Sequence, residues 1–194
     1  LYKGQYLQTS NIDASGTSEW HSGNGFIPIG SFSNRFVGTF DGSEFTINGI
    51  YVDRSRFYGT GLFGAVGLNG VIEDVGAENI NINDTSDAVT GGLVGLNRGK
   101  IESSYSTGRV SGNILTGGLV GENSGGVVNS SYATGTVNGS GFTTGGLIGG
   151  SVNSTIKKSY ADASVSGGDQ VGGLVGVSVG SIKEGVGDDS GVIV

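Results

Sequence analysis

The chain lacks cysteine and methionine, and it has one proline and one histidine in 194 residues. Without cysteine, neither a disulfide framework nor a thiolate metal site can form. A lone histidine cannot make a multi-histidine metal site, and His21 lies beside Trp20, so we expect it to have a packing or surface role. These absences exclude thiolate and multi-histidine chemistry from the chain itself.

Charge is also sparse. Charged residues make up 14% of the chain, and the formal net charge is −7 at pH 7. An acidic surface repels nucleic acid and anionic lipid, so we expect no nucleic-acid partner. No run of about 18 apolar residues is present, so the sequence also predicts no membrane insertion.

Glycine is abundant instead, at 41 residues, which is about three times its ordinary usage. The glycines follow no every-third pattern and proline is nearly absent, so the chain is not collagen-like. They recur in one element, Gly-Gly-Leu-Val-Gly or a close variant, at residues 91–95, 117–121, 145–149 and 172–176. A looser copy occupies residues 60–64.

The leucines of these elements set the period of the chain. They are Leu62, Leu93, Leu119, Leu147 and Leu174, which are 31, 26, 28 and 27 residues apart. A second element, containing Ser-Tyr and ending in valine, recurs at residues 101–110, 128–137 and 156–165. A fixed period of this length is typical of stacked repeats that bury one continuous core.

No segment shows a helical period of 3.6 over ten or more residues, so we expect strands. The sequence predicts an all-β fold, a right-handed parallel β-helix (β-solenoid) with about five coils of 26–31 residues and two or three short strands in each. We expect an N-terminal cap at residues 1–23, an entry coil at 24–59 and the repeats at 60–194, in one continuous domain. A propeller is excluded because its blades need about 40–50 residues.

Alternation along the second element predicts which side chains enter the core. The first copy has Ser104, Ser106, Gly108 and Val110 at alternate positions. The second copy places Ser, Ala, Gly and Val there, and the third Ser, Ala, Ala and Val, so we expect this set to face inward. The intervening positions begin with a tyrosine in each copy and continue with mostly polar residues. We therefore predict an outward ladder of tyrosines.

The Gly-Gly-Leu-Val-Gly element, followed by Ile-x-x-Ser-Tyr-Ala-Thr-Gly-x-Val, resembles the GLUG repeat. The entry segments at residues 36–42 and 47–51 also look like the coil that commonly precedes such repeats. GLUG repeats occur in large bacterial and archaeal surface proteins, in adhesins and in some immunoglobulin A peptidases. The resemblance implies a scaffold, because the peptidases carry their chemistry in a separate zinc domain, and its His-Glu-x-x-His motif is absent from this sequence.

Parallel β-helices also host glycosidases and polysaccharide lyases, which need convergent carboxylates on one face. The acidic candidates are Glu73, Asp74, Glu102, Asp162 and Glu184, and we expect them not to line up in one column. Because a fold does not carry a function by itself, the expected β-helix does not make the chain an enzyme. A carbohydrate-active enzyme is kept as an alternative hypothesis.

Calcium is the one cofactor that the acidic turns suggest. Asp84, Asp87, Asp188 and Asp189 could supply oxygen ligands, but the Gly-Gly-x-Gly-x-Asp nonapeptide of calcium rolls is missing. We expect no cofactor, and calcium stays an alternative without a motif.

The sequence favours a non-catalytic structural or adhesion module of a secreted or cell-surface protein. Its candidate ligand contacts are Tyr105, Tyr132, Tyr160, Thr107 and Thr134, although pairing between coils would by itself explain the tyrosines. Glycans, host or matrix proteins and proteins of neighbouring cells are the expected partners. The last repeat breaks off near residues 188–190, and an open coil end would favour self-association into an extracellular filament.

Overall fold

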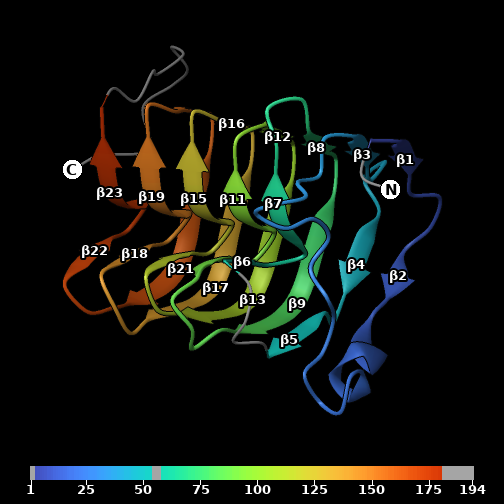
Figure 1. The fold of residues 1–194 in the computed structure, drawn as a ribbon, viewed down its shortest axis with the longest axis horizontal. Helices are drawn as coiled ribbons and strands as arrows, with labels where there is room; N and C mark the ends of the chain where they lie inside the picture. The colour runs from blue at the N-terminus through green and yellow to red at the C-terminus, as the bar shows by residue number, and fades with distance from the viewer. Residues whose placement is uncertain (1–2, 54–57, 181–194) are drawn as a thin grey trace.

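The computed structural model describes residues 3–53 and 58–180, which form a parallel β-solenoid of about five turns. Figure 1 shows the coils stacked side by side along the long axis, from the N-terminal coil to β23 at the other end. Each strand pairs in parallel with its copies in the neighbouring coils. The predicted all-β architecture is confirmed.

The strands of a coil belong to four sheets, each of which collects strands from successive coils. Sheet A contains β1 (Gln5–Leu7), β3 (Thr39–Asp41), β8 (Val71–Glu73), β12 (Lys100–Glu102), β16 (Val127–Asn129) and β20 (Thr155–Lys157). Sheet B contains β2 (Ile12–Asp13), β4 (Thr46–Asn48), β9 (Gly76–Asn83), β13 (Tyr105–Gly112), β17 (Tyr132–Gly139) and β21 (Tyr160–Ser166), and β5 (Tyr51–Asp53) also pairs with β9.

The other two sheets have five strands each. Sheet C contains β7 (Phe63–Val66), β11 (Val94–Asn97), β15 (Val120–Ser124), β19 (Ile148–Val152) and β23 (Val175–Val179). Sheet D contains β6 (Gly59–Thr60), β10 (Val89–Gly91), β14 (Leu115–Gly117), β18 (Thr143–Gly145) and β22 (Gln170–Gly172).

The prediction of two or three strands per coil is wrong, because each full coil has four. The repeated segment at 101–110 is split into β12 and β13 by a corner at Ser103, whose φ is 46°. Ser130 and Lys158 make the same left-handed corner in the next two coils, with φ of 49° and 46°. Non-glycine residues adopt this conformation rarely, so the sequence gives no signal for the corner.

The Gly-Gly-Leu element forms the corner between sheets D and C. Leu93, Leu119 and Leu147 are completely buried, so the leucine fills the core as expected. A Cβ placed on Gly118 would lie 2.2 Å from the carbonyl oxygen of Gly146 in the next coil. Glycine is therefore required here because the backbones of neighbouring coils touch.

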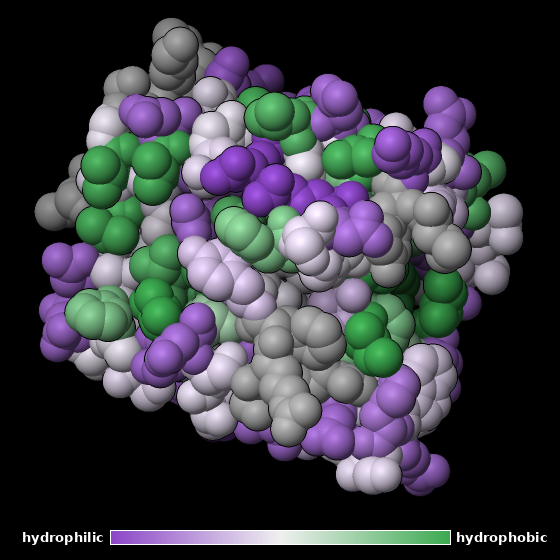
Figure 2. Space-filling view, viewed as in Figure 1, coloured by the Kyte–Doolittle hydropathy of each residue, from purple (hydrophilic) through white to green (hydrophobic). Residues whose placement is uncertain are grey.

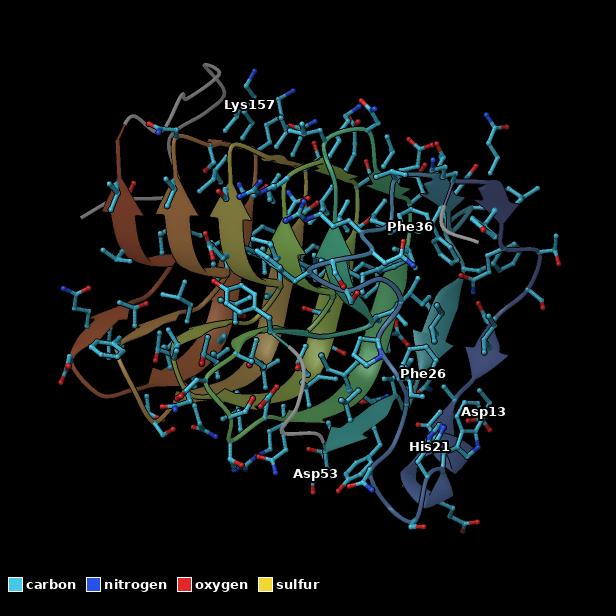
Figure 3. All side chains as sticks on the ribbon, viewed as in Figure 1. Asp13, His21, Phe26, Phe36, Asp53 and Lys157 are labelled. Atoms are coloured by element: carbon cyan, nitrogen blue, oxygen red, sulfur yellow. The ribbon has the colours of Figure 1, made fainter. Side chains whose placement is uncertain are left out.

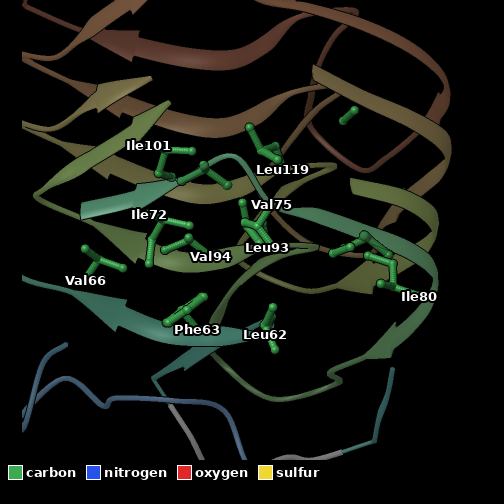
Figure 4. Packing of buried hydrophobic residues seen from close by; sticks show 14 of the residues in the cluster. Leu62, Phe63, Val66, Ile72, Val75, Ile80, Leu93, Val94, Ile101 and Leu119 are labelled. Carbon is green, nitrogen blue, oxygen red and sulfur yellow. The ribbon is translucent and has the colours of Figure 1, made fainter. Parts of the chain in front are cut away.

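One apolar core runs through the solenoid, and Figure 4 shows part of its packing. The inward positions of sheet A carry Ile72, Ile101, Val128 and Ile156, and those of sheet C carry Phe63, Val94, Val120 and Ile148. On sheet B, the predicted inward residues Ser106, Val110, Ala133 and Val137 are buried. The assignment of faces from alternation is confirmed at these positions but not at the glycines between them, because Gly135 is exposed and Gly108 is half-buried. Both glycines have a positive φ, 125° at Gly108 and 109° at Gly135, which interrupts the alternation.

The N-terminal segment, for which we expect a cap, contains two short strands and a 3-10 helix. β1 and β2 extend sheets A and B by one strand each. A 3-10 helix, η1 (Ser15–Glu19), follows, and its buried Thr17 accepts a hydrogen bond of 2.9 Å from the backbone N–H of Tyr51. Among the described residues, no helix is long and apolar enough to cross a bilayer.

Candidate recognition surface

The outer face of sheet B carries the predicted tyrosine ladder. The register of β13, β17 and β21 places Tyr105, Tyr132 and Tyr160 directly beside one another on consecutive coils. The rings of Tyr105 and Tyr132 are stacked with centroids 4.7 Å apart and planes 3° apart. The next pair is stacked at 5.0 Å and 8°. The predicted ladder is present.

The stacking covers most of the ring faces. Tyr132 has a tyrosine on each side, and the Tyr105 ring lies over Gly76, where a Cβ would be 2.4 Å from Cζ of that ring. Tyr160, at the end of the ladder, is 52% exposed. A sugar that stacks on aromatic faces would therefore have access mainly to Tyr160, while the other two rings present edges and hydroxyls.

The first tyrosine hydroxyl is held by a carboxylate. Tyr105 Oη donates a hydrogen bond of 2.7 Å to Oε1 of Glu78 on β9. Burial first, and then this carboxylate, raise the pKa of Tyr105 well above the ordinary tyrosine range. Burial also raises the pKa of Tyr132, so both phenols stay neutral and can donate hydrogen bonds at physiological pH.

A second outward column lies two residues further along the strands. It contains Thr107 and Thr134, and Asp162 follows in the next coil. Oγ1 of Thr107 accepts a hydrogen bond of 3.1 Å from the backbone N–H of Asn79, next to an irregularity in the β9–β13 register. The five candidate contact residues therefore share one face of sheet B, with hydroxyl groups in two adjacent columns.

The acidic candidates are partly aligned, contrary to the expectation. Sheet A places Asp41, Glu73 and Glu102 side by side on three consecutive coils, and Asn129 and Lys157 continue the column. Asp162 lies on sheet B, and Glu184 is outside the described residues. The alignment was missed because the turn lengths between the repeats differ, so positions 73 and 102 can be matched only once the strands are known.

This column contains carboxylates, which are the catalytic groups of many hydrolytic enzymes. Glu102 forms an ion pair with Lys100 and accepts a hydrogen bond of 3.0 Å from Nδ2 of Asn129. These two partners lower the pKa of Glu102 below its ordinary value, so it is an ionised group. A general acid needs a raised pKa, and among the described carboxyl groups burial raises that of Glu122, which is on sheet C.

The described calcium candidates accept hydrogen bonds from neighbouring residues. Asp84 is buried and accepts hydrogen bonds from the hydroxyl of Thr60 and from the backbone N–H of Ser86. Asp87 accepts a hydrogen bond of 3.2 Å from Asn113 in the next coil. Among the described residues, no group of three or more acidic or histidine side chains could hold a metal ion. Residues 188 and 189 lie outside them.

Figure 2 shows another face of the molecule, on which apolar side chains form separate patches divided by hydrophilic ones. One exposed cluster joins Phe32 and Tyr58, whose ring centroids are 4.8 Å apart, and the guanidinium of Arg35 lies 4.9 Å from the Phe32 ring. Sequence reasoning missed this cluster because its members come from irregular segments without a repeat. It also missed the buried pair of Asn97 and Asn123, which the repeat alignment could have revealed.

No protein-family model matches the chain. The chain is 40% identical over 121 residues to "Halomucin" of Haloquadratum walsbyi, in a match that covers 61% of this chain and 1% of that protein. It is 34% identical over 82 residues to "Putative Gly-rich membrane protein" of Evansella cellulosilytica, which covers 42% of this chain and 10% of that protein. The chain thus spans a small part of both relatives.

A solved structure has a similar fold. The crystal structure of "a putative immunoglobulin A1 protease from Bacteroides ovatus" superposes on 98% of this chain and 75% of its own, with a TM-score of 0.62 and 21% identity. At this identity the likeness shows the fold alone.

Proposed function

We propose that the chain is a non-catalytic structural and adhesion module of a secreted or cell-surface protein, built from GLUG-type repeats. The observation that carries the proposal is the register of sheet B, which repeats Tyr105, Tyr132 and Tyr160 in a straight column, beside Thr107 and Thr134. A face with repeated groups gives an extended ligand many weak contacts in register. The names of the two sequence relatives support a place at the cell surface.

The stacking of the ladder suggests how a ligand is contacted. Ring faces inside the ladder contact one another and serve the cohesion of the coils. Tyr132 and Thr134 are half-buried, so their outer edges and hydroxyls are the parts that a ligand would contact. Glycans and extracellular-matrix or neighbouring-cell proteins offer complementary hydroxyl, amide and carbonyl groups. We therefore expect hydrogen bonding to hydroxyl columns to dominate recognition, and ring stacking to act at Tyr160.

A binding screen of the domain against glycans and matrix proteins tests this proposal. For a ligand found in the screen, Thr134→Val should weaken binding, because it removes a hydroxyl without changing the side-chain shape. Thr39→Val, on the outer face of sheet A, is the matched control and should leave binding unchanged. Equal binding by the two variants would show that the proposed surface does not take part in ligand binding.

The runner-up is a carbohydrate-active enzyme, and the neighbouring Glu73 and Glu102 favour it. Two carboxylates on adjacent strands are about 5 Å apart at their Cα atoms. Incubation with acidic and neutral polysaccharides, followed by analysis of reducing ends, tests this alternative. Cleavage that is lost in Glu102→Gln would establish it, and an absence of cleavage by the folded protein would dismiss it.

Self-assembly into a filament is a third candidate. Within the described residues the four sheets end at β20, β21, β22 and β23, and a strand at a sheet edge can pair with another chain. Sedimentation velocity over a wide concentration range tests it. Growth of larger species with concentration would support a filament, and a constant monomer would oppose it.

A further inference from the structure

A cavity lies at the N-terminal end of the core, away from the recognition surface. It is about 290 Å³ in volume, open to solvent and lined almost entirely by apolar groups. Trp20, Phe26 and Phe40 contribute to its walls, together with the buried side chains of Ile47 and Leu62. Figure 3 shows Phe26 and Asp13 at this end of the molecule, beside the 3-10 helix.

The incomplete first coil explains the cavity. The first coil contributes only β1 to sheet A and β2 to sheet B, whereas sheets C and D begin in the next coil with β7 and β6. The opening is crossed by the η1 region, which brings small residues such as Ala14 and Gly16 to the cavity. Gly16 is exposed, and a Cβ on it would meet no atom within 4 Å, so nothing covers the cavity on that side.

The cavity walls are held in place by hydrogen bonds. The hydroxyl of Thr17 donates to the carbonyl oxygen of Ala14 at 2.7 Å and accepts from the N–H of Tyr51. Nδ1 of His21 is 2.9 Å from the carbonyl oxygen of Gly25, which closes the loop before Phe26. The pocket is therefore largely pre-formed, as small-molecule sites commonly are.

The size and charge of the cavity define the class of ligand. An apolar cavity of about 150 Å³ holds one benzene molecule, so this one has room for a single ring with a short side chain. Among the described lining residues, Asp13 is the only ionisable one. One of its carboxylate oxygens accepts a hydrogen bond of 3.0 Å from the N–H of Ser15, and the side chain is exposed at the solvent side. A carboxylate repels an anionic ligand and attracts a cationic end, which Trp20 would also favour.

We propose that this cavity binds a small molecule with one apolar ring and a positively charged amino end. The ring would lie between Trp20, Phe26 and Phe40, and the ammonium group would lie at the rim near Asp13. This site is independent of the outward columns, so it adds a ligand that the proposed adhesion function does not require.

The single tryptophan reports on this site directly, because Trp20 lines the cavity and no other tryptophan is present. Titration with 2-phenylethylamine at neutral pH should give a saturable change in tryptophan emission. Phenylacetate should bind several-fold more weakly because its charge is reversed, and butylamine should give no saturable change because it lacks the ring. Asp13→Asn keeps the acceptor for Ser15 and should reduce the preference for the amine over the acid.

Two leucine variants of the cap separate cavity binding from surface adsorption. Ala14→Leu places a side chain in the cavity and should abolish the response. Ser18→Leu, in the 3-10 helix that Ala14 precedes but outside the lining, should retain it. Circular dichroism and the melting temperature verify that both variants are folded. No saturable response, an equal response in Ala14→Leu, or a response to butylamine equal to that of the aromatic amine would overturn the proposal. Loss of the response in a chain extended upstream of Leu1 would also overturn it, since the preceding segment would then be the occupant.

Discussion

The Nδ2 group of Asn97 donates a hydrogen bond of 2.8 Å to Oδ1 of Asn123 in the next coil, and both side chains are completely buried. Oδ1 of Asn97 also accepts from the N–H of Gly99 at 3.0 Å, which fixes the turn after β11. A buried amide that loses its partner retains the full cost of desolvation. The pair therefore connects the geometry of one turn to the stacking of the next coil.

Asn123→Ala should destabilise the protein by about 2 kcal/mol, since it leaves the amide of Asn97 without its strongest acceptor. Chemical denaturation measured by circular dichroism gives the free energy of unfolding. Asn81→Ala, an exposed asparagine on β9, is the control and should change it by less than about 0.5 kcal/mol. Equal effects of the two substitutions would show that the buried pair contributes no special stability.

The middle of the tyrosine ladder should matter for stability. Tyr132→Ala removes two stacked contacts and should cost about 2–3 kcal/mol, whereas Tyr132→Phe keeps the rings and should cost much less. Thermal unfolding of the two variants provides the comparison. If a ligand is found and Tyr132→Ala lowers stability without weakening its binding, the ladder is structural only. Similar stability of the alanine and phenylalanine variants would contradict a cohesive role for the rings.

The corner between sheets A and B predicts opposite effects of one substitution at two sites. Ser130 has a φ of 49°, so Ser130→Gly relieves a left-handed conformation and should leave stability unchanged or raise it by up to about 1 kcal/mol. Ser111 lies inside strand β13 with no positive φ, so Ser111→Gly should lower stability by about 0.5–1 kcal/mol. Two urea unfolding curves measure the difference, and a loss at Ser130 equal to that at Ser111 would contradict the corner geometry.

Glu122 should make the folded protein more stable at acidic pH than at neutral pH. Burial raises its pKa above the ordinary glutamate value, and the charge of Arg98 only partly opposes this. Because the folded state holds the proton more tightly, the contribution is complete below the ordinary pKa and is lost as pH rises through the folded pKa. Glu122→Gln should therefore raise stability at pH 7 by a fraction of a kcal/mol, since solvent screens the half-exposed group.

The control for this pH effect is Glu102, whose pKa is lowered by Lys100 and Asn129. Its contribution is present above the ordinary pKa and is lost as pH falls through the folded pKa, so Glu102→Gln should lower stability at pH 7 or leave it unchanged. Melting temperatures between pH 3 and pH 8 compare the two variants. A Glu122→Gln protein that is less stable than the parent at pH 7 would refute the assignment.

The sequence predicted the fold because the leucine of each Gly-Gly-Leu element recurs at a fixed period. In a stack of repeats, such a leucine is expected to be buried in the core. Leu93 and Leu119 are in the core, and the alternation that follows them placed Val110 and Val137 inside and the tyrosines outside. These inferences need only the period of two in a strand and the stacking of equivalent positions. They hold because each coil repeats the environment of its neighbour.

Other features depend on contacts that the repeat does not encode. The left-handed φ of Ser103 divides a segment that appeared continuous, and the turns of unequal length concealed the alignment of Glu73 with Glu102. The cavity near Trp20 arises where the first coil is incomplete, so no internal copy of it exists to compare. Sequence reasoning was thus accurate inside the stack and weak at its corners and at its first coil.

The most direct test of the account is to treat immobilised polysaccharides and matrix proteins with the folded domain and measure retention and bond cleavage in the same samples. A structural and adhesion module should be retained on at least one ligand, show weaker retention after Thr134→Val and release no cleavage products. Release of new reducing ends that disappears in Glu102→Gln, with no retention on any ligand, would contradict the account.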